Sequence, residues 1–155
     1  DMFVAIILAV SLVVLTFLFH YIILRWLSGG MARIAMTASV RVFIIVLMTL
    51  GAHLVEVVLY AVAYALGDGV LGLGSFGGRM IAEPLDYLYF SIVSYTSLGL
   101  GDVFPLDHLR FITGVEALSG LLLIAWSGSF IYNAMNRLWP WQPCAEPNRA
   151  TDSMK

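Results

Sequence analysis

The chain has 155 residues, of which 61% are hydrophobic and only 12% are charged. A soluble domain of this size could not bury so much apolar surface in one core, so the composition is typical of a membrane protein. The net charge of −2 gives no reason to expect a nucleic-acid partner, and the one cysteine, Cys144, excludes an internal disulfide and a cysteine-cluster metal site.

Three apolar segments are long enough to cross a bilayer. A hydrocarbon core of about 30 Å needs about 20 helical residues. We expect spanning helices at residues 3–27, 40–66 and 111–138. The first has no basic residues before its apolar run and no A-x-A cleavage pattern after it, so we interpret it as a spanning helix rather than a signal peptide. A polar connector, Ser28 to Ser39, joins it to the second helix.

A glycine-rich stretch, Gly67 to Arg79, follows the second helix. It contains Gly72-Leu73-Gly74-Ser75-Phe76-Gly77, which fits the G-x-G-x-x-G pattern of dinucleotide-binding folds. That pattern requires a preceding strand within a βαβ unit, and neither is predicted here. We therefore interpret this stretch as a flexible outer loop.

The segment from Pro84 to Tyr95 has the features of a short helix. Pro84 lies in its first turn, and Glu83 and Asp86 lie at its positive end. At helical rise it is only about 18 Å long, which is too short to cross a bilayer. A half-helix that enters and returns is tolerated at membrane depth only where protein buries it or water lines it. The order of elements therefore favours a pore or a transport site.

Glycines alternate with other residues directly after this half-helix, in Ser97-Leu98-Gly99-Leu100-Gly101. Glycine permits backbone angles that are closed to other residues and lets several chains approach closely. An extended backbone of this kind can replace the water shell of a cation with carbonyl oxygens. Thr96 and Ser97 add hydroxyls at the inner mouth, and Asp102 adds a carboxylate at the outer mouth. The sequence therefore predicts an ion selectivity filter.

The run Thr96-Ser97-Leu98-Gly99-Leu100-Gly101-Asp102, followed by Pro105, resembles the potassium-channel signature T-T-V-G-Y-G-D-x-x-P. The resemblance covers residues 42–138 and implies that K⁺, the permeant ion, binds to the Ser97 hydroxyl and to filter carbonyls, with no other cofactor. The carbonyls expected to bind K⁺ are those of Ser97, Leu98, Gly99 and Leu100. Leu100 stands where the family has a tyrosine that braces the filter, and Ser97 stands where it has a threonine. A nonselective or Na⁺-permeant channel is therefore the alternative.

We expect an all-α integral membrane protein, with three transmembrane helices and a re-entrant pore helix with its filter loop in each subunit. Four identical subunits would surround one axis, because one filter strand cannot encircle an ion. We expect residues 1–39 to form an additional helix and a cytoplasmic connector, and we expect this helix to pack peripherally against the second. Residues 40–139 are expected to form the pore domain. Residues 140–155 are expected to form a short polar tail in the cytoplasm. The pore domain is divided into an outer helix (40–66), outer loop (67–83), pore helix (84–96), filter (97–102) and inner helix (111–138).

Basic residues near the helix ends predict the orientation. They gather around the first connector and after the third helix, at Arg25, Arg33, Arg41 and Arg137, with Trp26, Trp139 and Trp141 in the same interface. We expect the C-terminus in the cytoplasm and the N-terminus outside, in the inner membrane of a prokaryotic cell. Arginines eight residues apart do not form a voltage sensor, which needs one at every third position.

Ionisable residues within membrane helices have a high free-energy cost and usually have a functional role. In the family's geometry Glu116 lies behind the filter, where we expect it to brace the filter through hydrogen bonds. A direct part in ion binding or gating is the alternative. Gly120 falls where the family's inner helix often has a hinge, so we expect it to be a gating hinge.

His53 and Glu56 share one face of the second helix. We expect them to bond to the first helix, where Ser11, Thr16 and His20 are possible partners. Proton sensing is an alternative, as is metal binding, although two ligands are too few. Asp102, Asp107 and His108 are expected around the outer mouth, and His108 is a second candidate for pH sensing.

The sequence as a whole predicts a protein that conducts K⁺ passively. Its expected partners are three identical subunits and membrane lipid. A non-conducting sensor or interaction subunit with the same fold is a further alternative. Secondary transport is not expected, because no inverted repeat or second broken helix is visible. Enzyme activity is not expected either, because no nucleophile–base pair stands out.

Overall fold

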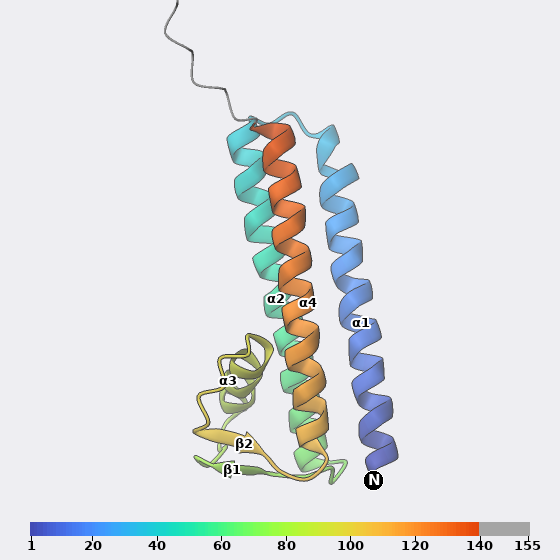
Figure 1. The fold of residues 1–155 in the computed structure, drawn as a ribbon, viewed down its shortest axis with the longest axis vertical. Helices are drawn as coiled ribbons and strands as arrows, with labels where there is room; N and C mark the ends of the chain where they lie inside the picture. The colour runs from blue at the N-terminus through green and yellow to red at the C-terminus, as the bar shows by residue number, and fades with distance from the viewer. Residues whose placement is uncertain (140–155) are drawn as a thin grey trace, which may run out of the picture.

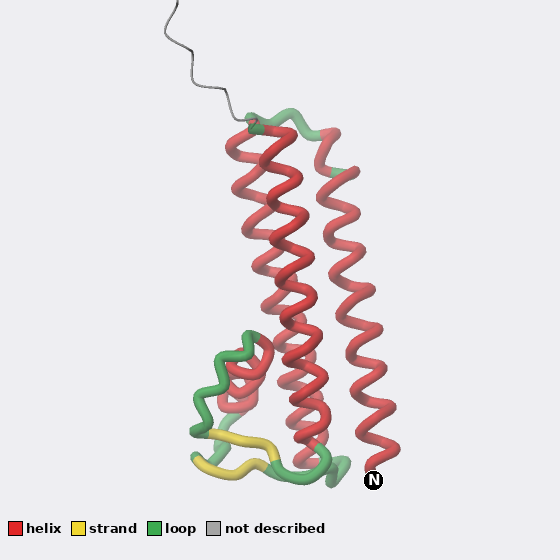
Figure 2. Tube along the Cα trace, in the orientation of Figure 1, coloured by secondary structure: helices red, strands yellow, loops and turns green. Residues whose placement is uncertain are grey.

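The computed structural model of the chain describes residues 1–139. Three long helices run along the longest axis, and a short helix and a small β-ribbon lie together at one end (Figures 1 and 2). The elements in chain order are α1 (Met2–Gly29), a 3-10 turn (Met31–Arg33), α2 (Ala38–Gly69), β1 (Phe76–Gly78), α3 (Pro84–Tyr95), β2 (Val103–Pro105) and α4 (Leu109–Leu138). The predictions for Trp141, Cys144 and the tail 140–155 lie outside the described residues.

The helices α1, α2 and α4 are each long and apolar enough to cross a membrane, as the sequence predicted. Their ends extend beyond the predicted ones by up to three residues. The largest extension is at the end of α2, where Gly67, Asp68 and Gly69 continue the helix. Gly67 is buried against Leu109, so that the missing side chain lets α2 and α4 approach closely.

Buried residues follow one stripe along α1, three or four positions apart, as expected for one helix face. The stripe consists of Ala5, Ala9, Leu12, Thr16, His20, Leu24 and Leu27. Its first three residues share one apolar cluster with Tyr60 of α2 and with Leu109 of α4. Helix α1 therefore packs against α2, as the sequence predicted, and also against α4.

The glycine-rich stretch is more ordered than the flexible loop that the sequence predicted. Its residues Phe76–Gly78 form β1, which pairs antiparallel with β2 in the register Phe76↔Pro105, Gly77↔Phe104 and Gly78↔Val103. Gly77 lies under the Phe104 ring, where a Cβ atom would come within 2.5 Å of a ring carbon. The all-helical architecture is confirmed, and this ribbon is an addition that the sequence analysis did not predict, because its two strands are short and far apart in the sequence.

The short helix α3 begins as its sequence predicts. Pro84 is in its first turn, and the Asp86 carboxylate accepts the backbone N–H groups of Ala82 (2.9 Å) and Glu83 (3.0 Å). These two backbone donors lower the pKa of Asp86. The start of α3 is therefore fixed by local hydrogen bonds.

Candidate functional site

Residues 96–102 leave the end of α3 as an irregular loop on the side of the molecule away from α1 (Figure 2). Every residue of this loop is exposed in the single chain. The side chains of Leu98 and Leu100 are 62% and 59% exposed. Apolar side chains this exposed indicate a surface that another chain or lipid covers.

The first three peptide groups of the loop have a common direction. Three N–H groups bond back to carbonyls in the last turn of α3: Ser97 to Ser94 (2.9 Å), Leu98 to Val93 (2.9 Å) and Gly99 to Val93 (3.3 Å). The chain has no cis peptide bond among its described residues, and a trans peptide directs its carbonyl opposite to its N–H. The carbonyl oxygens of Thr96, Ser97 and Leu98 therefore point away from α3.

The backbone dihedral φ alternates in sign along the loop. It is positive at Ser97 (58°), Gly99 (58°) and Gly101 (78°), and negative at the two leucines between them. A Cβ atom on either glycine would meet nothing within 4 Å, so the single chain requires glycine there for its φ and not for space. Ser97 adopts a conformation that is uncommon for a residue with a side chain. Backbone strain of this kind often marks a functional segment.

The far end of the loop is held at Asp102. Its carboxylate accepts the Tyr89 hydroxyl of α3 (2.9 Å), and its backbone carbonyl accepts the N–H of Arg79 (2.8 Å). The hydrogen bond to the Asp102 carboxylate raises the pKa of Tyr89. Tyr89 was missed by the sequence analysis; its position three residues after Asp86 on a short helix gave no sign that it faces the loop.

Glu116 is fully buried between three helices. Its carboxylate accepts the Ser91 hydroxyl of α3 (2.5 Å) and the Tyr64 hydroxyl of α2. The sequence predicted bracing hydrogen bonds for Glu116 but did not identify Ser91 or Tyr64 as partners. The contacts join α4 to the helix that carries the loop, and the role of Glu116 in the loop's support stays a prediction.

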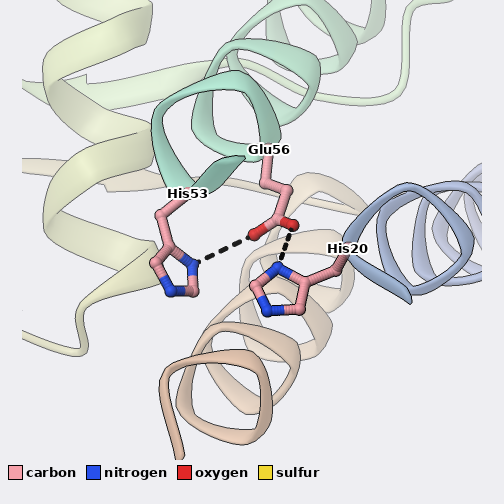
Figure 3. Close-up of side chains that lie close together, drawn as sticks. All are labelled: His20, His53 and Glu56. Carbon is pink, nitrogen blue, oxygen red and sulfur yellow. Dashed lines mark hydrogen bonds and ion pairs between the residues drawn. The ribbon is translucent and has the colours of Figure 1, made fainter. Parts of the chain in front are cut away.

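Glu56 is the second buried carboxylate, and it joins α2 to both α1 and α3. It accepts the Tyr95 hydroxyl (2.5 Å) and lies 2.8 Å from His20 Nδ1 and 3.2 Å from His53 Nδ1 (Figure 3). Of the three partners considered on the first helix, the structure brings only His20 to this carboxylate. Thr16 instead bonds to the Leu12 carbonyl of its own helix, and Ser11 is exposed.

Gly120 packs directly against the end of α3. A Cβ atom at this position would collide with the backbone carbonyl of Tyr95. Helix α4 is continuous from Leu109 to Leu138, so Gly120 provides a close approach in this structure. Its role as a gating hinge stays a prediction.

Asp107 and His108 lie in the turn that leads into α4. This turn is bonded to the segment before β1, through Leu106 N–H to Ser75 (2.8 Å) and His108 N–H to Leu73 (3.0 Å). Asp107 has a positive φ of 49° and an exposed side chain, and His108 is half-buried. A role of His108 in pH sensing stays a prediction.

Comparison with known proteins gives a family match for the part of the chain that contains this loop. A family model described as an ion channel matches residues 55–137, which extend from the middle of α2 to the end of α4. No curated protein and no solved structure matches the chain.

The first prediction concerns the contact between Gly120 and Tyr95. We expect Gly120→Ala to lower the thermal unfolding midpoint of the solubilised protein, because overpacking against backbone costs about 1–3 kcal/mol. Gly114→Ala and Gly128→Ala are matched controls on the same helix, since a Cβ atom at either position meets nothing within 4 Å. Equal midpoints for all three variants would contradict the close packing.

The second prediction concerns Glu116. Glu116→Leu removes one acceptor of the Ser91 and Tyr64 hydroxyls, which retain the Val57 carbonyl (2.8 Å) and the Thr113 hydroxyl (3.2 Å). Each lost hydrogen bond costs about 0.5–1.5 kcal/mol. We expect thermal midpoints in the order wild type, Glu116→Gln, Glu116→Leu, because glutamine keeps one acceptor oxygen.

A double-mutant cycle provides the control for this prediction. Ser91→Ala should cost clearly less stability in the Glu116→Leu background than in the wild type. The same cost in both backgrounds would show that the hydrogen bond between Ser91 and Glu116 does not contribute.

Proposed function

The chain belongs to the ion channel family, and we propose that it forms a passive cation pore, selective for K⁺, in which loop 96–102 is the selectivity filter. The observation that carries the proposal is the direction of the first three peptide groups of the loop. Their N–H groups bond to α3, and their carbonyl oxygens point to the exposed side. A row of carbonyl oxygens that accept no backbone hydrogen bond within residues 1–139 suits a dehydrated cation.

The surroundings of the loop also favour a cation over an anion. The carboxyl end of α3, which has the negative partial charge of the helix dipole, lies where the loop begins. The Asp102 carboxylate lies at the other end and is oriented by Tyr89. We propose that Asp102 attracts cations at the outer mouth and that Glu116 supports the filter from behind.

One loop lines only one side of an ion, so the proposal requires several copies of the chain. We propose four, arranged around one axis, in agreement with the resemblance of the loop to the potassium-channel signature. The exposed Leu98 and Leu100 side chains would then lie against neighbouring subunits. In this arrangement α3 is a re-entrant pore helix and α4 lines the inner cavity.

The elements at the two ends of the molecule suit a cell-membrane pore whose N-terminal end faces outside. The N-terminus, α3 and the β-ribbon lie at one end of the molecule, and the connector between α1 and α2 lies at the other (Figure 1). Arg25, Arg33 and Arg41 flank that connector, so we propose that it faces the cytoplasm.

Two alternatives differ from this proposal in their function. A nonselective or Na⁺-permeant pore is favoured by Leu100, which lacks the hydroxyl and ring of tyrosine. A non-conducting subunit of the same fold is the other, and the flux measurement below distinguishes it.

The third prediction concerns the glycines of the loop. Purified protein in liposomes should conduct K⁺, and Gly99→Ala should reduce the flux at least tenfold, because a side chain at positive φ costs about 1–2 kcal/mol in each subunit. Gly72→Ala is the matched control, since Gly72 has the same φ of +58° and the same open surroundings. It should leave the flux unchanged.

Two results would argue against the filter assignment. Equal flux in the Gly99→Ala and Gly72→Ala proteins would place conduction elsewhere. Absence of K⁺ flux in the wild type at every pH and voltage would favour the non-conducting subunit.

The fourth prediction concerns selectivity. With K⁺ on one side of a bilayer and Na⁺ on the other, the reversal potential should have the sign expected for K⁺ permeation. Leu100→Tyr should move it further in that direction by restoring a ring and a hydroxyl. Leu85→Tyr, at another exposed leucine outside the loop, is the control. A reversal potential near zero in the wild type would support the nonselective alternative.

A further inference from the structure

Three potential metal ligands meet inside the bundle. They are His20 of α1 and His53 and Glu56 of α2, and their nearest ligand atoms all lie within 4.8 Å of one another. Figure 3 shows both imidazole rings turned with Nδ1 toward the Glu56 carboxylate. We propose that this cluster binds a divalent transition-metal ion of the Zn²⁺ type.

The second nitrogen of each ring supports this proposal. His20 Nε2 and His53 Nε2 lie 2.9 Å and 3.0 Å from the same Ser127 hydroxyl oxygen of α4. A hydroxyl oxygen has two lone pairs and can accept an N–H from both rings. In that arrangement Nδ1 of each ring shares a proton with Glu56 in this structure and can bind a metal ion once that proton is lost. Histidines that ligate metals almost always donate their other N–H to an oxygen in this way.

The two contacts with the carboxylate are close to the edge lengths of a tetrahedral site, and the three ligand atoms lie within 4.8 Å of one another. Bonds of about 2.0–2.1 Å place the ligand atoms of Zn²⁺ about 3.3 Å from one another. The Glu56 oxygens lie 2.8 Å from His20 Nδ1 and 3.2 Å from His53 Nδ1. Small side-chain rotations would admit the ion and release to solvent the protons that now lie between nitrogen and carboxylate. The Tyr95 oxygen lies 2.8 Å from His53 Nδ1 and is a further oxygen beside the cluster.

Burial and charge also favour a cation here. His20 and Glu56 have no exposed side-chain surface, and His53 is 16% exposed, which provides access from the surface. Within residues 1–139, both ion pairs of Glu56 are with these histidines, so no lysine or arginine neutralises it. A carboxylate in an apolar bundle is costly unless a cation compensates it.

The ligand chemistry selects the class of metal. Two imidazole nitrogens and one carboxylate suit Zn²⁺ and Co²⁺, whereas Mg²⁺ and Ca²⁺ prefer oxygen ligands only. The site joins α1 to the channel part of the chain, because His20 and His53 lie outside the residues that match the ion channel family and Glu56 lies within them. A metal there would fasten α1 to the rest of the chain.

Metal binding is tested on the full chain in detergent, with Cys144→Ser as the background so that the thiol does not compete. After treatment with a chelator and dialysis against Zn²⁺, elemental analysis should find one metal ion per chain. His20→Gln, His53→Gln and Glu56→Gln should each lose it. Ser127→Ala should weaken metal binding about 10–100-fold, because it removes the hydroxyl that orients both histidine rings.

His108→Gln is the matched control, because His108 is the third histidine of the chain and lies at the start of α4. It should bind Zn²⁺ as the background protein does. Zn²⁺ should also raise the thermal midpoint of the background and of His108→Gln, but not that of His20→Gln.

A spectroscopic measurement keeps the test independent of how the variants fold. Co²⁺ bound to the background protein should give the intense visible bands of a tetrahedral site, and X-ray absorption should find two imidazoles at about 2.0–2.1 Å. Absence of stoichiometric metal, an octahedral Co²⁺ spectrum, or equal binding by His20→Gln and His108→Gln would overturn the proposal. In that case the same contacts are a hydrogen-bonded network only.

Discussion

Two buried carboxylates hold the short helix α3 against the long helices. Ser91 donates to Glu116 of α4, and Tyr95, one turn later on the same face, donates to Glu56 of α2. An apolar membrane interior contains no water to replace these partners, so each carboxylate depends on the hydroxyl that it meets. The position of loop 96–102 follows from this attachment, because the loop begins at the residue after Tyr95. Gly120 completes it by letting α4 approach the Tyr95 backbone.

The loop is anchored at both ends and exposed between them. At its start the carbonyls of Val93 and Ser94 accept its N–H groups, and at its end Tyr89 and Arg79 bond to Asp102. The carbonyl oxygens are left on the outer side because every trans peptide has its N–H and its carbonyl on opposite sides. One chain therefore presents only one side of an ion's environment, and in the proposed tetramer the other copies would supply the rest. This is the physical reason to connect membership of the ion channel family with this loop in particular.

The first helix is tied to the rest of the chain by polar contacts as well as by apolar packing. His20 bonds to Glu56 of α2 and lies 2.9 Å from Ser127 of α4, so one side chain reaches both neighbouring helices. Because Glu56 also accepts the Tyr95 hydroxyl, the network extends from α1 to the residue before the loop. A proton or metal ion held by the histidine cluster would lie beside the Tyr95 hydroxyl, and Tyr95 is the residue before the loop.

The sequence by itself determined the features that depend on neighbours along the chain. The three apolar lengths, the start of α3 at Pro84 and the loop glycines are of this kind, because hydropathy, capping and φ are local properties. Only the tertiary structure decided which face of each long helix is buried, since both faces are apolar in a membrane protein and no periodic pattern separates them. It also decided that Glu116 meets Ser91 and Tyr64, that Glu56 meets His20 rather than Ser11, and that Phe76–Gly78 pairs with Val103–Pro105. These partners lie tens of residues apart, where sequence spacing does not restrict distance, and the need to satisfy each buried polar group selects them.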